Sequence, residues 1–248
     1  MRIVAVATHK ERMYDLFVKS AKKHEIPLDI LGMNQAWQGF AWRWTLIQEH
    51  LKTLQDDELV LVTDAFDTLI MKDATAFEKQ FKAFNVPIVF SKDPDIMDFK
   101  PIARYYRRRI FGKDPIINGG TYIGKCRALQ SFIRHLKYTN DMDDQVFLTQ
   151  LHRMVHMTVD TKYKLMYHFV GWRTNDKIPD ACVITFPAGG HNKKVIARLG
   201  YEYEDETYTE AGLMSLRRAG QYGPYFWREI LWFIMSVCVL SALVWTMY

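Results

Sequence analysis

Two aspartates that follow an apolar stretch are the residues of this sequence best suited to chemistry. Residues 58–71 read ELVLVTDAFDTLIM, so that Asp64 and Asp67 come directly after the run Leu59–Thr63. Neighbouring carboxylates repel each other unless a cation or a hydrogen-bond donor lies between them. A divalent metal ion carrying phosphate oxygens would meet that need. A structural role, in which Asp64 caps a turn and Asp67 is solvated, fits this fragment equally well when it is taken alone.

A second group of acids lies in the segment NDMDDQ at residues 140–145. Asp141, Asp143 and Asp144 precede a helical run, so N-capping and the helix dipole account for part of the cluster. The cluster holds more acids than one cap requires, which favours an additional role at a binding site. Upstream, the paired glycines of INGGTYIG let a backbone approach a ligand closely, and Asn118 could bind a sugar hydroxyl or hold the loop. NGG is also a common turn sequence.

The histidine with the most suggestive neighbours is His191, in PAGGHNKK at Pro187–Lys194. Glycines and two lysines, Lys193 and Lys194, share its loop, a combination that suits a metal ligand beside a diphosphate. His168, in YHFVG, is the rival candidate for a third protein ligand to the metal. The sequence leaves the choice between the two histidines open.

The segments around these motifs predict alternating strands and helices. Short connections between them indicate a mostly parallel sheet covered by helices on both faces. The apolar run before Asp64 should then be a buried strand, with both aspartates at its carboxyl end, where such strands present ligands. The predicted strands are Ile3–Thr8, Leu28–Leu31, Leu59–Thr63, Pro87–Ser91, Met157–Asp160 and Cys182–Thr185, and the predicted helices are Glu11–His24, one ending near Thr53, one from Asp73 or Thr75 to Phe84, and Cys126–Leu136.

Length and charge limit the possible functions. A chain of 248 residues and 29.2 kDa can form one α/β domain, and a net charge of +5 suits anionic ligands. This charge is too small to indicate nucleic acid as a partner; the most basic stretch, Arg104–Lys113, is more typical of a solvated helix face beside a site. Cys126, Cys182 and Cys238 lack metal-ligand spacing, which favours reduced thiols.

The last residues are typical of a membrane span. Ile230–Tyr248 contains no charged residue, and at about 1.5 Å per residue a helix of this length nearly crosses a hydrocarbon core of about 30 Å. Arg217, Arg218 and Arg228 precede it, and Ile3–Ala7 is too short for a signal peptide, so the N-terminal part should face the cytoplasm. The alternative is a buried C-terminal core helix. We therefore expect a folded domain at 1–215, a juxtamembrane segment at 216–229 and a single-pass C-terminal anchor at 230–248.

Taken in order, the motifs VATHKE, LGMNQAW, TDAFD, FSKD, INGGTYIG, DMDDQVFLTQL, DTKYKL and AGGHNKK resemble the glycosyltransferase domain of the procollagen-lysine hydroxylase and glycosyltransferase family. The resemblance covers about residues 3 to 200. It implies a GT-A fold, a Rossmann-like mixed α/β sheet sandwiched by helices. It also implies that the domain binds a UDP-sugar with Mn²⁺ or another divalent cation and transfers the sugar to a hydroxyl group.

The resemblance assigns roles to individual residues. Asp64 and Asp67 match the family's metal-ligand aspartates. Val6 and Thr8 would contact the uridine, Asn118 and Gly120 match part of a glycine-rich loop, and Asp143, Asp144 and Gln145 match an acidic patch near the transferred sugar. Asp141 belongs to the same cluster, and Lys194 would accompany His191 at the diphosphate.

Two departures from the family pattern stand out. The family's last metal histidine falls closest to Pro187, which displaces His191 by about a turn. Arg43 lies near the place of a family lysine and is a candidate replacement for it. A site with a shifted or missing third protein ligand can still bind Mn²⁺, because water and diphosphate oxygens complete the coordination.

In the mechanism that follows, the metal and cationic side chains stabilise charge on the departing diphosphate. If the enzyme inverts, a carboxylate of the 141–144 cluster acts as general base on the acceptor hydroxyl. The acceptor would be a hydroxyl-bearing protein or glycan. One alternative is a membrane-anchored, non-catalytic nucleotide-sugar-binding protein, motivated by the missing histidine. A phosphohydrolase of the haloacid-dehalogenase type fits less well, because its acids lie two residues apart rather than three.

Overall fold

We describe a computed structural model of the chain at residues 1–93, 115–140, 144–151, 157–169, 177–186 and 193–203. The chain divides into one unit of residues 1–205 and a second of residues 206–248, which lies outside the described residues. All statements below concern the first unit. The predicted span at Ile230–Tyr248 and the domain limit at residue 215 therefore stay predictions. In the described part, no helix combines the length and the apolarity that crossing a membrane requires.

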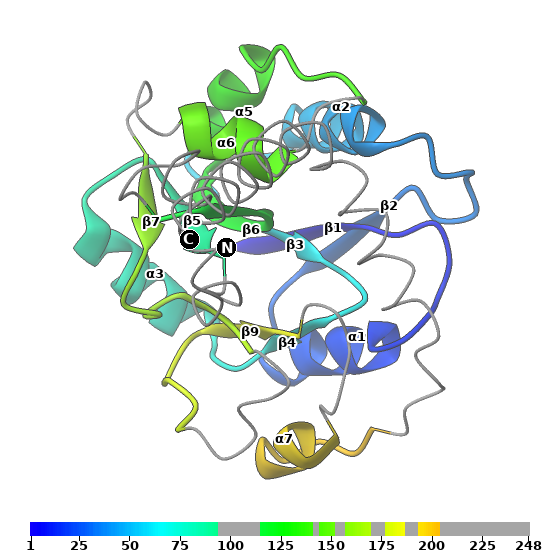
Figure 1. The fold of residues 1–248 in the computed structure, drawn as a ribbon, viewed down its shortest axis with the longest axis vertical. Coiled ribbons are helices and arrows are strands. Elements are labelled where there is room, and N and C mark those ends of the chain that lie inside the picture. Colours follow the sequence, from blue (N-terminus) through cyan, green and yellow to red (C-terminus); the bar gives the residue numbers. More distant parts are fainter. Residues whose placement is uncertain (94–114, 141–143, 152–156, 170–176, 187–192, 204–248) are drawn as a thin grey trace, which may run out of the picture. The chain divides into compact units, whose positions relative to one another are not determined.

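A six-stranded mixed sheet forms the centre of the unit (Figure 1). β1 pairs in parallel with β2 and β3, and β5 pairs in parallel with β7. β6 lies between the two groups and is antiparallel to both β3 and β5. The mixed, mostly parallel sheet predicted from the sequence is thus confirmed. In spatial order the strands are β2 (Leu28–Leu31), β1 (Arg2–Val6), β3 (Leu59–Asp64), β6 (Ile117–Lys125), β5 (Ile88–Lys92) and β7 (Thr158–Asp160).

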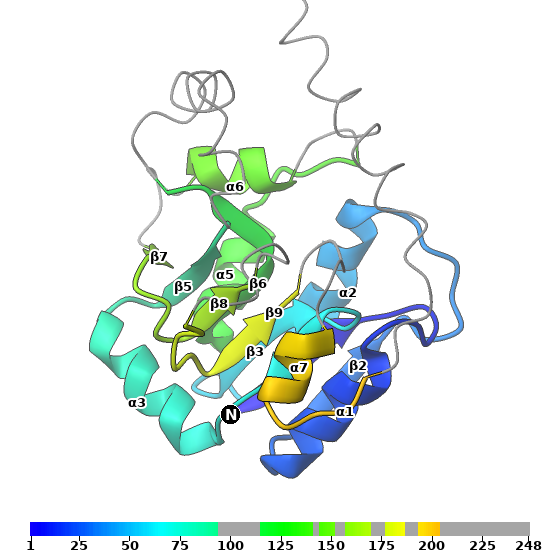
Figure 2. The same cartoon turned by 60° about the horizontal axis from the view of Figure 1, so that its bottom comes forward.

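A second sheet of three short strands packs against one face of the first. It has the order β4 (Thr68–Ile70), β9 (Val183–Thr185) and β8 (Met166–His168). β4 is antiparallel to β9, and β8 is parallel to it. The sequence pattern predicted β9, whose three residues Val183–Thr185 are all β-branched, but neither β4 nor β8. Figure 2 shows this small sheet next to the main sheet, with helix α7 (Lys193–Arg198) on its outer side.

Helices cover both faces of the main sheet (Figure 1). On one face, α2 (Phe40–Leu51), α5 (Cys126–Arg134) and α6 (Asp144–Leu151) share a buried cluster with the even-numbered residues of β1, β3 and β5. On the other face, α1 (Tyr14–Lys23), α3 (Ala74–Phe84) and the small sheet form a second cluster. β3 supplies Val60 and Val62 to the first cluster and Leu59 and Leu61 to the second, which explains why its sequence is continuously apolar.

Local capping explains where α3 begins and ends. The Asp73 side chain accepts a hydrogen bond from the backbone N–H of Ala76 at 2.9 Å, which satisfies a donor of the first turn. Asn85 ends the helix in the left-handed conformation, with φ of 51°. The sequence predicted this helix from Asp73 or Thr75 to Phe84, and the structure confirms it. The glycine-rich INGG segment differs from a turn: it lies within β6, the longest strand of the main sheet.

Candidate active site

Asp64 lies where the buried strand β3 ends, beside Val6 of the neighbouring parallel strand. Its side chain is 47% exposed, while Thr63 before it is fully buried. Its Oδ1 atom forms an ion pair with the guanidinium of Arg43, whose Nη2 atom is 3.0 Å away. The predicted position of Asp64 at a strand end, accessible to a ligand, is therefore confirmed.

Arg43 reaches this carboxylate from the first turn of α2. Its side chain is only 5% exposed, and its Nη2 atom also donates a hydrogen bond to the carbonyl oxygen of Gly120 at 3.2 Å. A buried guanidinium needs compensation by a charge and by acceptors, and Asp64 and Gly120 supply both. Arg43 thus ties α2 to the ends of β3 and β6.

The antiparallel strand β6 brings Asn118 and Gly120 to the same place. Asn118 Oδ1 accepts the backbone N–H of Gly120 at 2.9 Å. A Cβ atom on Gly120 would contact the Asp64 carboxylate, at 3.1 Å from Cγ, and Asn118 Oδ1 at 3.0 Å. Glycine is required here by close approach and not by an unusual φ. The structure therefore gathers four residues proposed from the sequence: Asp64, Arg43, Asn118 and Gly120.

Asp67 lies in the connection between β3 and β4. Burial and, to a smaller extent, the negative charge of Asp64 raise the pKa of its carboxyl group from 3.8 to about 7, while Arg12 and Arg43 act in the opposite direction. Thr68 Oγ1 donates a hydrogen bond to Asp67 Oδ1 at 3.5 Å. A divalent cation bound near both carboxylates would offset the repulsion from Asp64 that helps to raise this pKa.

These carboxylates fit a hard divalent cation, although they do not complete its coordination. Within the described ranges, no three His, Cys, Asp or Glu side chains gather into a metal-binding group. The proposed third ligand, His191, lies outside the described residues. Asp64 and Asp67 would thus contribute oxygen ligands, and diphosphate and water oxygens would supply others.

His168, the rival ligand, occupies a different environment. It is 3% exposed in β8, and its Nδ1 atom forms a short hydrogen bond with Thr185 Oγ1. Burial lowers its pKa to about 3, so the ring is neutral at pH 7. Its Nε2 atom is buried and has no hydrogen-bond partner among the residues that the structure describes. It does not join Asp64 and Asp67 in a metal-binding group.

A layer of hydroxyl groups supports the floor of the site, and sequence reasoning missed it. Thr63 Oγ1 is 3.0 Å from Thr68 Oγ1 and 3.1 Å from Thr121 Oγ1, and all three residues are buried. Ser91 donates a hydrogen bond to the carbonyl oxygen of Thr121 at 2.7 Å. The layer links β3, β4, β5 and β6 to one another beside the site, since Thr63 adjoins Asp64 and Thr121 adjoins Gly120 in the sequence. Isolated Thr and Ser in strands gave no signal of it.

The loop between β2 and α2 borders the site and exposes aromatic rings. Thr8, a predicted uridine contact, accepts the backbone N–H of Asn34 at 2.8 Å and so holds the start of this loop. Trp37 and Phe40 are 50% and 43% exposed, and their ring centroids lie 5.6 Å apart. Such rings can stack on a base or a sugar, a signal that the sequence analysis did not use.

The other proposed residues are only partly placed. Asp141, Asp143 and His191 lie outside the described residues. Asp144 and Gln145 open α6, and only the backbone of these two residues is described. Lys194 is exposed on α7.

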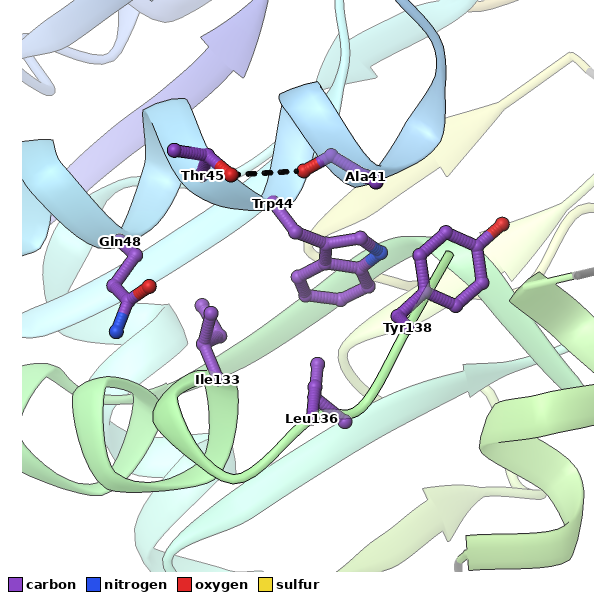
Figure 3. A pocket seen from close by; sticks show the side chains of 7 residues that line it. All are labelled: Ala41, Trp44, Thr45, Gln48, Ile133, Leu136 and Tyr138. Carbon is purple, nitrogen blue, oxygen red and sulfur yellow. Dashed lines mark hydrogen bonds between the residues drawn. The ribbon is translucent and has the colours of Figure 1, made fainter. Parts of the chain in front are cut away.

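A small pocket lies on the other side of α2, away from the residues above. Its volume is about 120 Å³, and Figure 3 shows Trp44 and Tyr138 at one end and Gln48 at the other. Thr45 is not available to a ligand as a donor, because its hydroxyl binds the carbonyl oxygen of Ala41 at 3.1 Å. The pocket contains no charged side chain and shares no residue with the Asp64 site.

Comparison with known structures gives neighbours of low identity. One is a galactosyltransferase, LgtC, in complex with donor and acceptor sugar analogues, with 14% identity, a TM-score of 0.48, and coverage of 86% of this chain and 99% of the other. Another is a glycosyltransferase involved in glycosylation of the major capsid of PBCV-1, with 12% identity, a TM-score of 0.49 and coverage of 80% and 98%.

Sequence relatives are more informative. The multifunctional procollagen lysine hydroxylase and glycosyltransferase LH3 of Rattus norvegicus is 26% identical over 160 residues, 60% of this chain and 22% of that protein. Procollagen-lysine,2-oxoglutarate 5-dioxygenase 2 of Mus musculus is 25% identical over 245 residues, 92% of this chain and 32% of that protein. The chain thus spans between about a fifth and a third of the length of these relatives. A family model described as "PLOD GT domain" matches residues 1–177, and the chain therefore belongs to this family of glycosyltransferase domains.

Proposed function

We propose that this domain transfers a hexose from a UDP-sugar to a hydroxyl group of a protein or glycan, with the help of a divalent cation such as Mn²⁺. The observation that carries the proposal is the convergence on Asp64. A half-exposed carboxylate at the end of β3 meets the buried cation Arg43 and a glycine that leaves room for it. Family membership supplies the reaction class. The UDP-sugar donor and the divalent cation are what the family resemblance implies, and carboxylates at this position suit such a cation.

Asp64 and Asp67 would hold the cation, which when bound stabilises negative charge on the leaving diphosphate. Arg43 orients the Asp64 carboxylate and neutralises part of its charge before any ligand arrives. Gly120 leaves room for the Asp64 carboxylate, and Asn118 holds the backbone N–H of Gly120 beside it. The exposed ring of Trp37 offers a stacking surface for the base.

The acceptor side of the proposal depends on the acids at 141–144. An inverting transfer needs a carboxylate that removes the proton of the acceptor hydroxyl, and Asp143, Asp144 and Asp141 are the candidates. Gln145 would bind hydroxyls of the transferred sugar. Lys194 and His191 would contact the diphosphate from the loop before α7.

The direct test is turnover of UDP-hexoses by the purified full-length chain, with and without Mn²⁺. UDP release should require the metal, and Asp64→Asn should abolish it. Because this variant also leaves the buried guanidinium of Arg43 without its counter-charge, its melting temperature should fall, and turnover is compared at a temperature at which circular dichroism shows the variant folded. Lys52→Ala serves as a surface control, since its exposed pair with Glu49 lies at the far end of α2. Metal-independent turnover, or full activity in Asp64→Asn, would refute the proposal.

A non-catalytic nucleotide-sugar-binding protein is the second candidate. It is favoured by the absence of a three-residue metal-binding group within the described ranges. Calorimetry separates the two functions: a binding protein would take up UDP-hexose with Mn²⁺ but release no UDP over hours, whereas a transferase would release it.

A further inference from the structure

We propose that Asn140 is a positioning residue, whose side-chain amide fixes the start of α2 and thereby aims Arg43 at Asp64. Its side chain forms hydrogen bonds with Ala41 and Gln38, at the start of α2. It acts through the first turn of α2, to which it is bound although it lies 99 residues away from Ala41 in the sequence.

α2 begins without a cap of its own. The N-cap residue is Gly39, which has no side chain to accept a hydrogen bond from the first turn. Asn140 supplies the missing acceptor: its Oδ1 atom receives the backbone N–H of Ala41 at 2.8 Å. A cap that Ser, Asp or Asn normally provides from the adjacent residue is here provided by a distant segment.

The same amide also holds the residue before the cap. Asn140 Nδ2 donates a hydrogen bond to the carbonyl oxygen of Gln38 at 2.9 Å. The amide therefore binds both sides of the turn that contains Gly39. A Cβ atom on Gly39 would lie 2.5 Å from Asn140 Oδ1, and Gly39 has a φ of 99°, so both the space and the backbone conformation require glycine.

Arg43 follows one turn later. Its backbone N–H binds the carbonyl oxygen of Gly39 at 3.2 Å, so the geometry of the clamped turn determines the direction in which its side chain leaves the helix. That side chain, 5% exposed, reaches Asp64 Oδ1 at 3.0 Å. Without the Asn140 amide the first turn of α2 would fray. The backbone of Arg43 would then no longer be held in the position from which its side chain reaches Asp64. In the sequence, Asn140 is followed directly by the acids at 141–144.

The first experiment needs no ligand. In the full chain, NMR detection of the Arg43 side-chain N–H groups should show slow exchange, because the guanidinium is buried and paired. Asn140→Ala should accelerate this exchange about tenfold, since a cap is worth about one factor of ten in the stability of a helix end. Asp73→Ala is the matched control: it removes the cap of α3, of the same type and at 2.9 Å, and should leave Arg43 unchanged.

Asn140→Asp distinguishes the two halves of the clamp. Aspartate can still accept from Ala41 but cannot donate to Gln38. We expect an exchange rate for Arg43 between those of the native chain and Asn140→Ala. Equal protection of Arg43 in the native chain and in Asn140→Ala would overturn the proposal.

The second experiment rests on the proposed function. Asn140→Ala should weaken the binding of UDP with Mn²⁺ about fivefold in the native background. When Arg43 is already Met or Lys, the same change should weaken binding by less than about twofold, because Asn140 acts through Arg43. Two backgrounds, Arg43→Met and Arg43→Lys, are used so that the test can still be made if one of them does not fold. Equal weakening in both backgrounds would show that Asn140 does not act through Arg43. If the native chain binds no UDP with Mn²⁺, the proposed function fails, and the exchange of the Arg43 side chain alone decides the role of Asn140.

Discussion

The carboxylate of Asp64 occupies the space that a side chain at position 120 would need. Gly120 lies on β6, and a Cβ atom there would come within 3.1 Å of Asp64 Cγ. Because β6 is antiparallel to β3, this contact joins residues from two strands that run in opposite directions. The glycine therefore belongs to the site even though it carries no functional group.

Gly120→Ala should displace the Asp64 carboxylate and weaken the binding of Mn²⁺ and UDP more than it reduces stability. The carboxylate can move toward solvent, since the Asp64 side chain is 47% exposed. Gly124→Ala is the control from the same strand: its Cβ would lie 2.8 Å from the carbonyl oxygen of Pro87, away from the site. It should lower the melting temperature without changing the affinity of the folded protein. Calorimetry measures the affinity and thermal unfolding measures the stability of each variant. An equal loss of affinity in Gly120→Ala and Gly124→Ala would contradict the prediction.

The part of the site on β3 could be predicted from local sequence, because an apolar run with acids at its end is a local pattern. The contribution of β6 could not be predicted in the same way. NGG reads as a turn, and only the pairing of Leu59 with Lys125 and of Val62 with Tyr122 brings Asn118 and Gly120 toward Asp64. Such pairing depends on contacts between distant segments.

Arg43 illustrates a second limit of sequence analysis. Its position near a family lysine suggested a cationic contact, but not that the side chain would be 5% exposed and bound to Asp64. The hydrogen bonds of Asn140 to the start of α2 and the layer of buried hydroxyl groups could not be predicted for the same reason. Each joins residues that lie far apart in the chain. Local motifs thus predict which residues carry charge, and tertiary contacts decide how they are held.

Thr63→Val should destabilise the domain by about 1 to 3 kcal/mol, because it leaves the buried hydroxyls of Thr68 and Thr121 without a shared partner. The two side chains are nearly the same size, so packing changes little. Thr53→Val is the control, since Thr53 is exposed and binds only the carbonyl oxygen of His50 at the end of α2. Urea unfolding should show a loss in Thr63→Val alone. A loss of similar size in both variants would indicate that the buried layer adds nothing.

Asp67 should make the metal-free protein less stable as the pH rises. Its pKa of about 7 in the folded state is above the value of 3.8 for an unperturbed aspartate, so the folded state binds the proton more tightly. The stabilisation is complete below about pH 4 and is lost as the pH rises through 7. Asp67→Asn should remove this component from the pH dependence of the free energy of unfolding. An unchanged pH profile in Asp67→Asn would show that Asp67 titrates normally.

His168 should produce the opposite trend. Burial lowers its pKa from 6.5 to about 3, so the unfolded chain binds a proton that the folded state rejects. Stability is complete above pH 6.5 and is lost as the pH falls toward 3, by up to about 1.4 kcal/mol per pH unit. Because the Asp67 and His168 trends oppose each other over the same pH range, the native profile alone can look flat.

Comparison of variants separates the two groups. His168→Leu removes the titrating ring and cannot bind Thr185, so it should lower stability at pH 7 but flatten the acid side of the profile. In the Asp67→Asn background, where the opposing trend is gone, the difference between His168 and His168→Leu should be visible directly by urea unfolding at pH 5, 6 and 7. The prediction fails if Asp67→Asn and the double variant Asp67→Asn with His168→Leu lose stability in parallel between pH 7 and 5. In that case His168 is not held neutral in the fold, and the buried environment of β8 does not control its protonation.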